Sequence, residues 1–200
     1  MKVRQGLTMV MLAAPLLALG VVPARADTVV SLAVTKYEQN MAHFCWLASA
    51  ETVIRFMGGG TRSQCTYLRY ANNSSSSTLC SDQSGTSTKI RKIINGYLGS
   101  GHDWSGYNTY LNAATLAGEI NANKPIIVWL TELSGSYSGA GHIVTAIGYK
   151  RNSSSGVVSA KILNWPWFVG SGTNANVKYY TMAALKKNAD FRTDDYMAGF

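Results

Sequence analysis

Nucleophilic catalysis by a thiol requires a cysteine, a base and a group that orients the base, and the chain supplies candidates in Cys45, His142 and Asn164. Cys45 comes directly before Trp46 and a segment with helical periodicity, so we expect it at the N-terminus of a helix. Unpaired backbone N–H groups and the helix dipole favour a negative group there, which should lower the pKa of the thiol. The alternative interpretation of Cys45 is a small, buried hydrophobic side chain.

The base must be one of three histidines. His43 lies only two residues from Cys45, which constrains it too strongly to be the obvious partner, and His102 lies in a Gly/Asp loop typical of a surface. His142 follows a flexible Gly-rich loop and begins an apolar strand, and a strand end is a rigid mount for a base. His142 is therefore the favoured base, with a structural histidine at a strand edge as the alternative.

Two further residues complete the candidate site. Asn164 ends the strand after that of His142, and two antiparallel neighbours can bring these residues together, so that Asn164 orients the imidazole. Gln39 precedes Cys45 by six residues, and its amide could join the Cys45 backbone N–H as a second oxyanion donor. The alternatives are a turn residue for Asn164 and a solvated polar residue for Gln39.

The elements that must position these residues follow from hydrophobic periodicity. The pattern predicts helices from Cys45 to the Gly58-Gly59-Gly60 stop, over 64–70, from Thr86 or Ser87 to Tyr97 and over 111–121. It predicts strands over 29–34, 125–130, 143–149, 157–163 and 177–180, a loop over 99–107, and a last helical piece from Thr181 to Leu185. Helices therefore dominate the first half and an antiparallel sheet the second, which is an α+β pattern.

The first 26 residues read as a secretory leader. Lys2 and Arg4 precede an apolar run from Leu7 to Val22, and Ala24-Arg25-Ala26 is a small-residue cleavage signal. The run is short for a membrane span, so an uncleaved anchor is the less favoured alternative, and no later segment is apolar enough to insert stably into a membrane. We expect cleavage after Ala26, a single domain over 27–200 and a secreted protein in the extracellular space or periplasm.

Secretion places the three cysteines in an oxidising compartment. Cys65 and Cys80 flank a polar stretch that a disulfide can close, whereas Cys45 has different surroundings, so we expect a Cys65–Cys80 bond and a free Cys45. On the count of cysteines alone, a buried and unreactive Cys45 is nearly as good an interpretation.

The composition and charge of the chain argue against several classes of function. Hydrophobic residues make up 46% and charged residues 14% of 200, which fits one globular domain and argues against disorder. The basic residues are scattered, and removal of the leader lowers the formal net charge from +8 to +5, so nucleic-acid binding is not expected. Three histidines without ligand spacing argue against zinc, and no organic cofactor is implied.

The order glutamine, cysteine, histidine, asparagine resembles that of papain-like cysteine peptidases. The residues that carry the resemblance are Gln39-x5-Cys45-Trp46, then Gly141-His142-Ile143-Val144-Thr145-Ala146-Ile147-Gly148-Tyr149, then Asn164-Trp165. The resemblance implies a papain-like fold with the site in a cleft between the helices and the sheet. It also implies Gln39 as oxyanion donor, Cys45 as nucleophile, His142 as base and Asn164 as the orienting residue.

The signature C-G-[SA]-C-[WY] is absent, because Ala42-His43-Phe44 precedes Cys45. Secreted bacterial papain-like peptidases, the AvrRpt2-like (C70-type) effectors and C39-type relatives, are more similar. The similarity rests on Phe44-Cys45-Trp46-Leu47-Ala48-Ser49-Ala50, Ser63-Gln64-Cys65 and Asn164-Trp165-Pro166-Trp167. Many of these have an aspartate at the third position, where this chain has Asn164.

The resemblance implies a secreted, monomeric cysteine endopeptidase that hydrolyses peptide bonds of a protein or peptide substrate through a Cys thioester. Three alternatives stay open. The same residues suit a transglutaminase-like or deamidating acyl transfer, and a cleft of this kind also suits a non-catalytic binding module. In a thiol-linked structural protein, Cys45 would instead pair between chains.

Overall fold

The computed structural model describes residues 26–99, 105–107, 111–131, 141–166, 176–181 and 192–198. Its helices are α1 (Cys45–Phe56), α2 (Gln64–Ala71), α3 (Ser87–Leu98) and α4 (Ala113–Asn121). Its strands are β1 (Thr28–Ser31), β2 (Ser105–Tyr107), β3 (Ile126–Thr131), β4 (His142–Arg151), β5 (Val158–Trp165), β6 (Asn176–Thr181) and β7 (Arg192–Ala198). The predicted leader lies outside the described residues except for Ala26, and so does His102.

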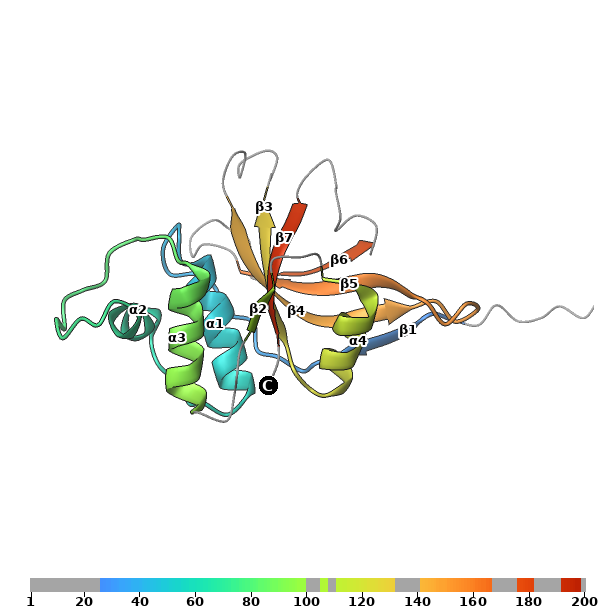
Figure 1. Ribbon diagram of the computed structural model, residues 1–200, viewed down its shortest axis with the longest axis horizontal. Helices are drawn as coiled ribbons and strands as arrows, with labels where there is room; N and C mark the ends of the chain where they lie inside the picture. The colour runs from blue at the N-terminus through green and yellow to red at the C-terminus, as the bar shows by residue number, and fades with distance from the viewer. Residues whose placement is uncertain are drawn as a thin grey trace, which may run out of the picture.

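All these strands belong to one antiparallel sheet (Figure 1). The strand order is β2-β7-β3-β4-β5-β6, and β1 pairs with the far part of β4. The hairpin of β4 and β5 forms the centre, with Thr145 opposite Asn164. This arrangement is the α+β architecture that the sequence predicts, and it is consistent with a papain-like fold.

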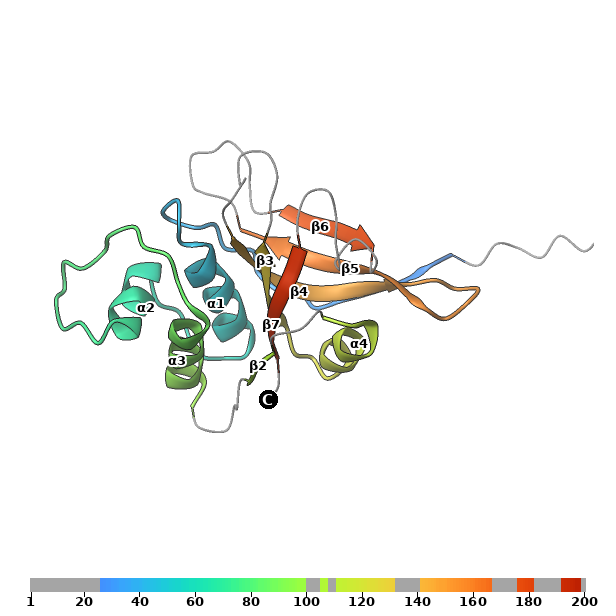
Figure 2. The same cartoon turned by 45° about the horizontal axis from the view of Figure 1, so that its top comes forward.

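The helices cover the sheet from two sides (Figure 2). Successive residues of a strand point to opposite faces, and β4 shows this clearly. Ile143 belongs to the core formed with α1, α2 and α3, whereas Val144 belongs to the core formed with α4. The near-continuous apolar run of β3 follows from burial on both faces, with Ile127 in the first core and Val128 in the second.

The first long helix ends as predicted. α1 stops at Phe56, and Gly58 adopts a φ of 86°, a conformation that favours glycine.

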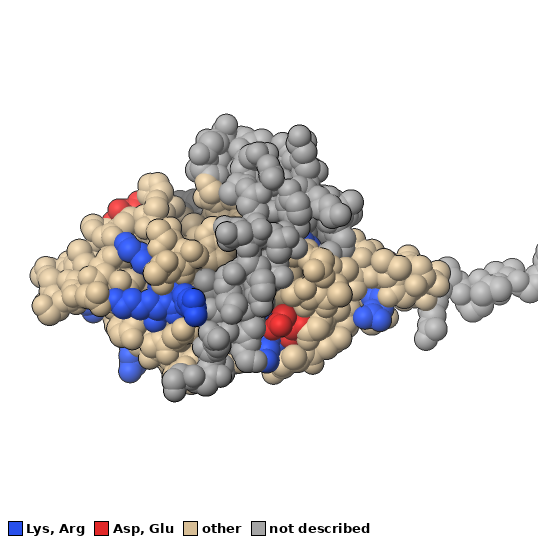
Figure 3. Space-filling model, in the orientation of Figure 1, with Lys and Arg blue, Asp and Glu red and all other residues tan. Residues whose placement is uncertain are grey.

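Within the described residues, no helix is long and apolar enough to cross a membrane. Basic side chains gather over the helical part of one face (Figure 3), and α3 itself carries Lys89, Arg91 and Lys92 without an acidic residue.

Two predictions about elements were wrong in detail, and a third cannot be compared with the described residues. The predicted loop over 99–107 contains β2, which pairs with β7. The sequence of β7 shows no hydrophobic alternation, so this pair of strands was not predicted. Thr181 is the last residue of β6, and the predicted helical piece after it, over 182–185, lies outside the described part. The predicted strand over 29–34 stops at Ser31, where its pairing with β4 ends at Gly148. Pairing across the sheet, which local patterns do not contain, decides the two wrong cases.

Candidate active site

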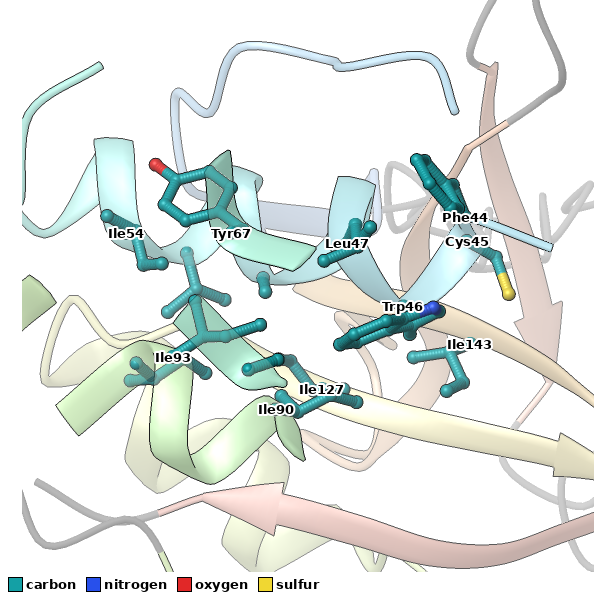
Figure 4. Packing of buried hydrophobic residues seen from close by; sticks show 14 of the residues in the cluster. Phe44, Cys45, Trp46, Leu47, Ile54, Tyr67, Ile90, Ile93, Ile127 and Ile143 are labelled. Carbon is teal, nitrogen blue, oxygen red and sulfur yellow. The ribbon is translucent and has the colours of Figure 1, made fainter. Parts of the chain in front are cut away.

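Cys45 is the first residue of α1, as the sequence predicts, and it is the free cysteine of the described residues. Its side chain is 9% exposed, beside fully buried Phe44 and Trp46. Figure 4 shows its sulfur at the end of the packed core, near Ile143. The backbone N–H groups of a helix's first turn have no partner within the helix, so the thiol lies where a negative charge is favoured.

The segment that follows the disulfide holds the turn before α1. Cys65 is bonded to Cys80, which is the pairing that the sequence predicts. Trp46 donates its Nε1 hydrogen to the Gln83 carbonyl at 2.9 Å, and a Cβ added to Gly85 would lie 2.2 Å from the Trp46 ring. Only a glycine allows this close approach, which fixes Trp46 and with it the start of α1.

His43 has a partner in this same segment. Its backbone N–H donates to Asp82 Oδ1 and its ring Nδ1 lies against Asp82 Oδ2, both at 2.8 Å. The His43 side chain is 63% exposed. These contacts agree with the sequence argument that His43 is not the obvious base for Cys45, and Asp82 is a residue that sequence reasoning missed.

Ile143, the residue that follows His142, connects the start of β4 with α1. The Cys45 thiol has a backbone hydrogen bond with Ile143, and Ser49, one turn along α1, donates its hydroxyl to the Ile143 carbonyl at 3.0 Å. The backbone of Ile143 therefore faces α1. The start of β4 and the start of α1 are fixed against each other at this point.

Burial raises the pKa of the Cys45 thiol to about 11. Backbone hydrogen bonds from Ile143, Trp46 and Cys45 itself act in the opposite direction, and the charge of Asp82 adds slightly to the rise. The sequence predicts a lowered pKa from the helix N-terminus. That effect is present in the backbone contacts, but the loss of water around the thiol outweighs it in this state.

His142 begins β4, as predicted, and it is 3% exposed. Its ring packs against Trp165, with 4.8 Å between the ring centroids and 34° between the planes. Trp165 thus covers one side of the His142 ring.

Asn164 lies at the end of β5, where the sequence places it, and is 1% exposed. Its Nδ2 donates to Thr52 Oγ1 at 3.3 Å, and the Thr52 hydroxyl donates to the Ala48 carbonyl at 2.9 Å. Because Asn164 is opposite Thr145, it shares the face that α1 covers. This amide therefore has a contact with α1 that the sequence did not predict, and the predicted orientation of His142 by Asn164 stays a prediction.

Gln39 is 4% exposed in the turn before α1, and its Nε2 donates to the Ala42 carbonyl at 2.7 Å. This bond holds the Gln39 amide against the turn that leads into α1. Gln64 contacts the backbone on both sides of Gln39. Sequence reasoning noted Gln64 in a motif but gave it no role.

Ser49 and Thr52 were also missed, although a signal for them exists. They follow Cys45 at four and seven residues, so they lie on the same face of α1 as the thiol. Small polar residues on the buried face of a helix need hydrogen-bond partners. Here Ser49 bonds the start of β4 and Thr52 bonds the end of β5.

In the described part of the chain, no group of three or more His, Cys, Asp or Glu side chains could hold a metal ion.

Comparison with protein families shows which family the chain is similar to. A model described as the Peptidase_C39 like family matches residues 31–185, well over half of the chain. The matched range contains Gln39, Cys45, His142 and Asn164. No curated protein matches the chain.

Proposed function

We propose, from the premise that this chain belongs to the Peptidase_C39 like family, that it is a secreted cysteine endopeptidase. It would hydrolyse peptide bonds of a protein or peptide substrate through a thioester on Cys45. The observation that carries the proposal is the contact of Cys45 with Ile143, because it puts a helix-start thiol directly beside the residue that follows a buried histidine.

Each step of the reaction uses a residue of this chain. The Cys45 sulfur attacks the carbonyl carbon of the substrate while His142 takes the thiol proton. The C–N bond then breaks, and the amine leaves with that proton, which gives the thioester. Water attacks the thioester with His142 again as base, and the acid product and the Cys45 thiol are released.

The raised pKa of Cys45 supports a resting site in which the thiol keeps its proton. Under this proposal, His142 acts as general base while the sulfur attacks an electrophile, in place of a thiolate that exists beforehand. The backbone N–H groups around the sulfur then stabilise the charge that develops on it.

The negative oxygen that forms on the substrate carbonyl needs donors. We assign them to the Cys45 backbone N–H and the Gln39 side-chain amide, which is buried in the preceding turn. A buried amide that is already oriented costs no reorganisation when the oxyanion forms.

We assign Asn164 to the orientation of His142. Its bond to Thr52 fixes the end of β5 on α1, and its neighbour Trp165 packs on the His142 ring. Asn164 is thus a positioning residue in this proposal, acting through the strand end.

Secretion is supported by the predicted leader, by the Cys65–Cys80 bond and by the position of Asp27. Asp27, the first residue after the predicted cleavage site, accepts from Lys150 Nζ at 2.9 Å, next to the start of β1. Three further claims stay predictions from the sequence. They are that the protein is a monomer, that it is more similar to AvrRpt2-like effectors than to papain, and that it acts as a bacterial effector.

Product analysis of a peptide library by mass spectrometry tests the proposal. Wild-type protein should cut backbones, with product masses that account for one added water per cut, and Cys45→Ala should cut none. A shift of about one dalton on glutamine would instead indicate deamidation, a crosslink would indicate amine transfer, and unchanged peptides would favour a binding module.

A further inference from the structure

We propose that Gln64 is a positioning residue that holds the oxyanion donor Gln39 in place. The inference rests on the proposed function, because it explains how that site is built. The feature behind it is a buried side-chain amide on α2 that bonds the chain on both sides of Gln39.

The contacts of Gln64 bracket Gln39. Its Oε1 accepts from the Asn40 backbone N–H at 2.9 Å, and its Nε2 donates to the Glu38 carbonyl at 2.7 Å. One amide therefore bonds the peptide groups before and after Gln39, as a neighbouring strand would. The segment from Glu38 to Asn40 has this support without belonging to a long strand.

The Gln64 amide is itself held in one orientation. It is 2% exposed, and its Nε2 also donates to Glu51 Oε2 of α1 at 3.0 Å. Glu51 is 5% exposed and forms an ion pair with Arg55 at 2.5 Å. Since a carboxylate accepts but does not donate, this partner requires the NH₂ group of Gln64 on its side.

The backbone of Gln64 is fixed as well. It is the first residue of α2, whose N-cap Ser63 accepts from the Thr66 backbone N–H at 3.2 Å, and the next residue, Cys65, is bonded to Cys80. A cap and a disulfide thus anchor the one side chain that reaches the Gln39 turn from α2. The motif Ser63-Gln64-Cys65 gains a physical role in this way.

Loss of the Gln64 amide should weaken the stabilisation of the oxyanion and leave the reactivity of the Cys45 thiol unchanged. Gln39 keeps its own bond to Ala42, but the peptide groups around it would lose their partners. A displacement of about 1 Å in a catalytic group can cost roughly 100-fold in rate. Cys45 is held separately, through Trp46 and Ile143.

The test replaces Gln64 by methionine, which has a similar volume and no hydrogen-bonding amide. Gln64→Met should lower kcat by about 10- to 100-fold with KM changed by less than about 3-fold, since an oxyanion donor acts on the transition state. Alkylation of Cys45 by iodoacetamide should keep its wild-type rate, because that reaction forms no oxyanion.

Gln83→Met is the matched control. The Gln83 side chain also bonds two other side chains, those of Asn72 at 3.1 Å and Ser81 at 3.0 Å, and the substitution keeps the Gln83 backbone carbonyl that accepts from Trp46. This variant should keep the wild-type kcat. Equal losses in both variants would show a general effect on folding and would overturn the proposal.

A double variant separates a direct effect from one through Gln39. If Gln64 acts through Gln39, then Gln39→Ala with Gln64→Met should be no slower than Gln39→Ala alone. Multiplied effects of the two substitutions would overturn the proposal.

Hydrogen exchange separates this inference from the proposed function. The Asn40 amide should exchange faster in Gln64→Met and at the wild-type rate in Gln83→Met, whether or not the protein cuts peptides. Unchanged exchange in Gln64→Met would overturn the positioning role. Faster exchange in a protein without peptidase activity would leave that role standing and refute the proposed function.

Discussion

Ser49 donates its hydroxyl to the backbone carbonyl of Ile143, 3.0 Å away, and both partners are buried. This bond joins the helix that begins with Cys45 to the strand that begins with His142. A hydroxyl one helical turn from the thiol therefore sets the distance between the two elements that carry the proposed nucleophile and base.

Replacing Ser49 by alanine should lower both stability and rate. The buried Ile143 carbonyl would lose this donor, which costs about 1–3 kcal/mol of unfolding free energy, measurable by urea denaturation. The kcat should fall by roughly 10-fold or more, because the two catalytic elements lose a fixed contact.

Ser159→Ala is the control for this prediction. Ser159 also donates to a β4 carbonyl, that of Lys150 at 3.2 Å, but at the far end of the strand and only partly buried. Its removal should leave kcat unchanged. A kcat of Ser49→Ala equal to that of Ser159→Ala would contradict the positioning of the site by Ser49.

Asn164→Ala should lower kcat because it releases the end of β5 from α1 and moves Trp165 relative to His142. Thr52→Val, which keeps the shape of the side chain and removes its hydroxyl, should reproduce most of that loss, roughly 10-fold. Steady-state kinetics on one peptide substrate compare the two. If Thr52→Val retained full activity while Asn164→Ala lost it, Asn164 would act on His142 without α1.

The sequence predicted well what local patterns contain. From the helical spacing after Cys45, the glycine stop and the apolar strand after the Gly-rich loop, we predicted that Cys45 and His142 lie at the starts of their elements, where the structure has them. The partners of these elements could not be predicted, since a strand's register is set across the sheet. Because Asn164 pairs with Thr145, its side chain faces α1, and no spacing along the chain contains that information.

The alkylation rate of Cys45 should depend on pH through His142. Burial raises the pKa of the thiol to about 11, so without a base almost none is ionised at pH 6. His142→Ala should therefore alkylate more slowly than wild type at pH 6, and its rate should rise about tenfold per pH unit toward pH 11. The two profiles should converge at the alkaline end.

His43→Ala is the control for the base, because His43 is bonded to Asp82 and lies outside the proposed proton transfer. Its profile should follow the wild type. Superimposable profiles of wild type and His142→Ala would mean that His142 does not accept the thiol proton.

Lys161 should make the stability depend on pH. It is 1% exposed on β5, and burial lowers its pKa from 10.5 to about 7. Between these values the unfolded chain is protonated and the folded chain is not, so stability rises with pH over this window. The destabilisation is complete below pH 7 and vanishes as the pH approaches 10.5.

Lys161→Met should therefore raise the unfolding free energy by a few kcal/mol at pH 6, with a gain that shrinks as the pH rises, at about 1.4 kcal/mol per pKa unit. Urea denaturation of both proteins from pH 6 to pH 10 measures this. A gain that stays constant across the range would show that Lys161 is not neutralised on folding.

A covalent intermediate is the most direct evidence for the thioester on Cys45. With a peptide nitrophenyl ester, the good leaving group should make acylation faster than deacylation, so nitrophenolate appears in a burst of about one per protein molecule. After acid quenching, the mass of the acyl group should be found on the peptide that contains Cys45, and Cys45→Ala should show neither burst nor adduct. An adduct on another residue, or a burst that survives in Cys45→Ala, would contradict the account.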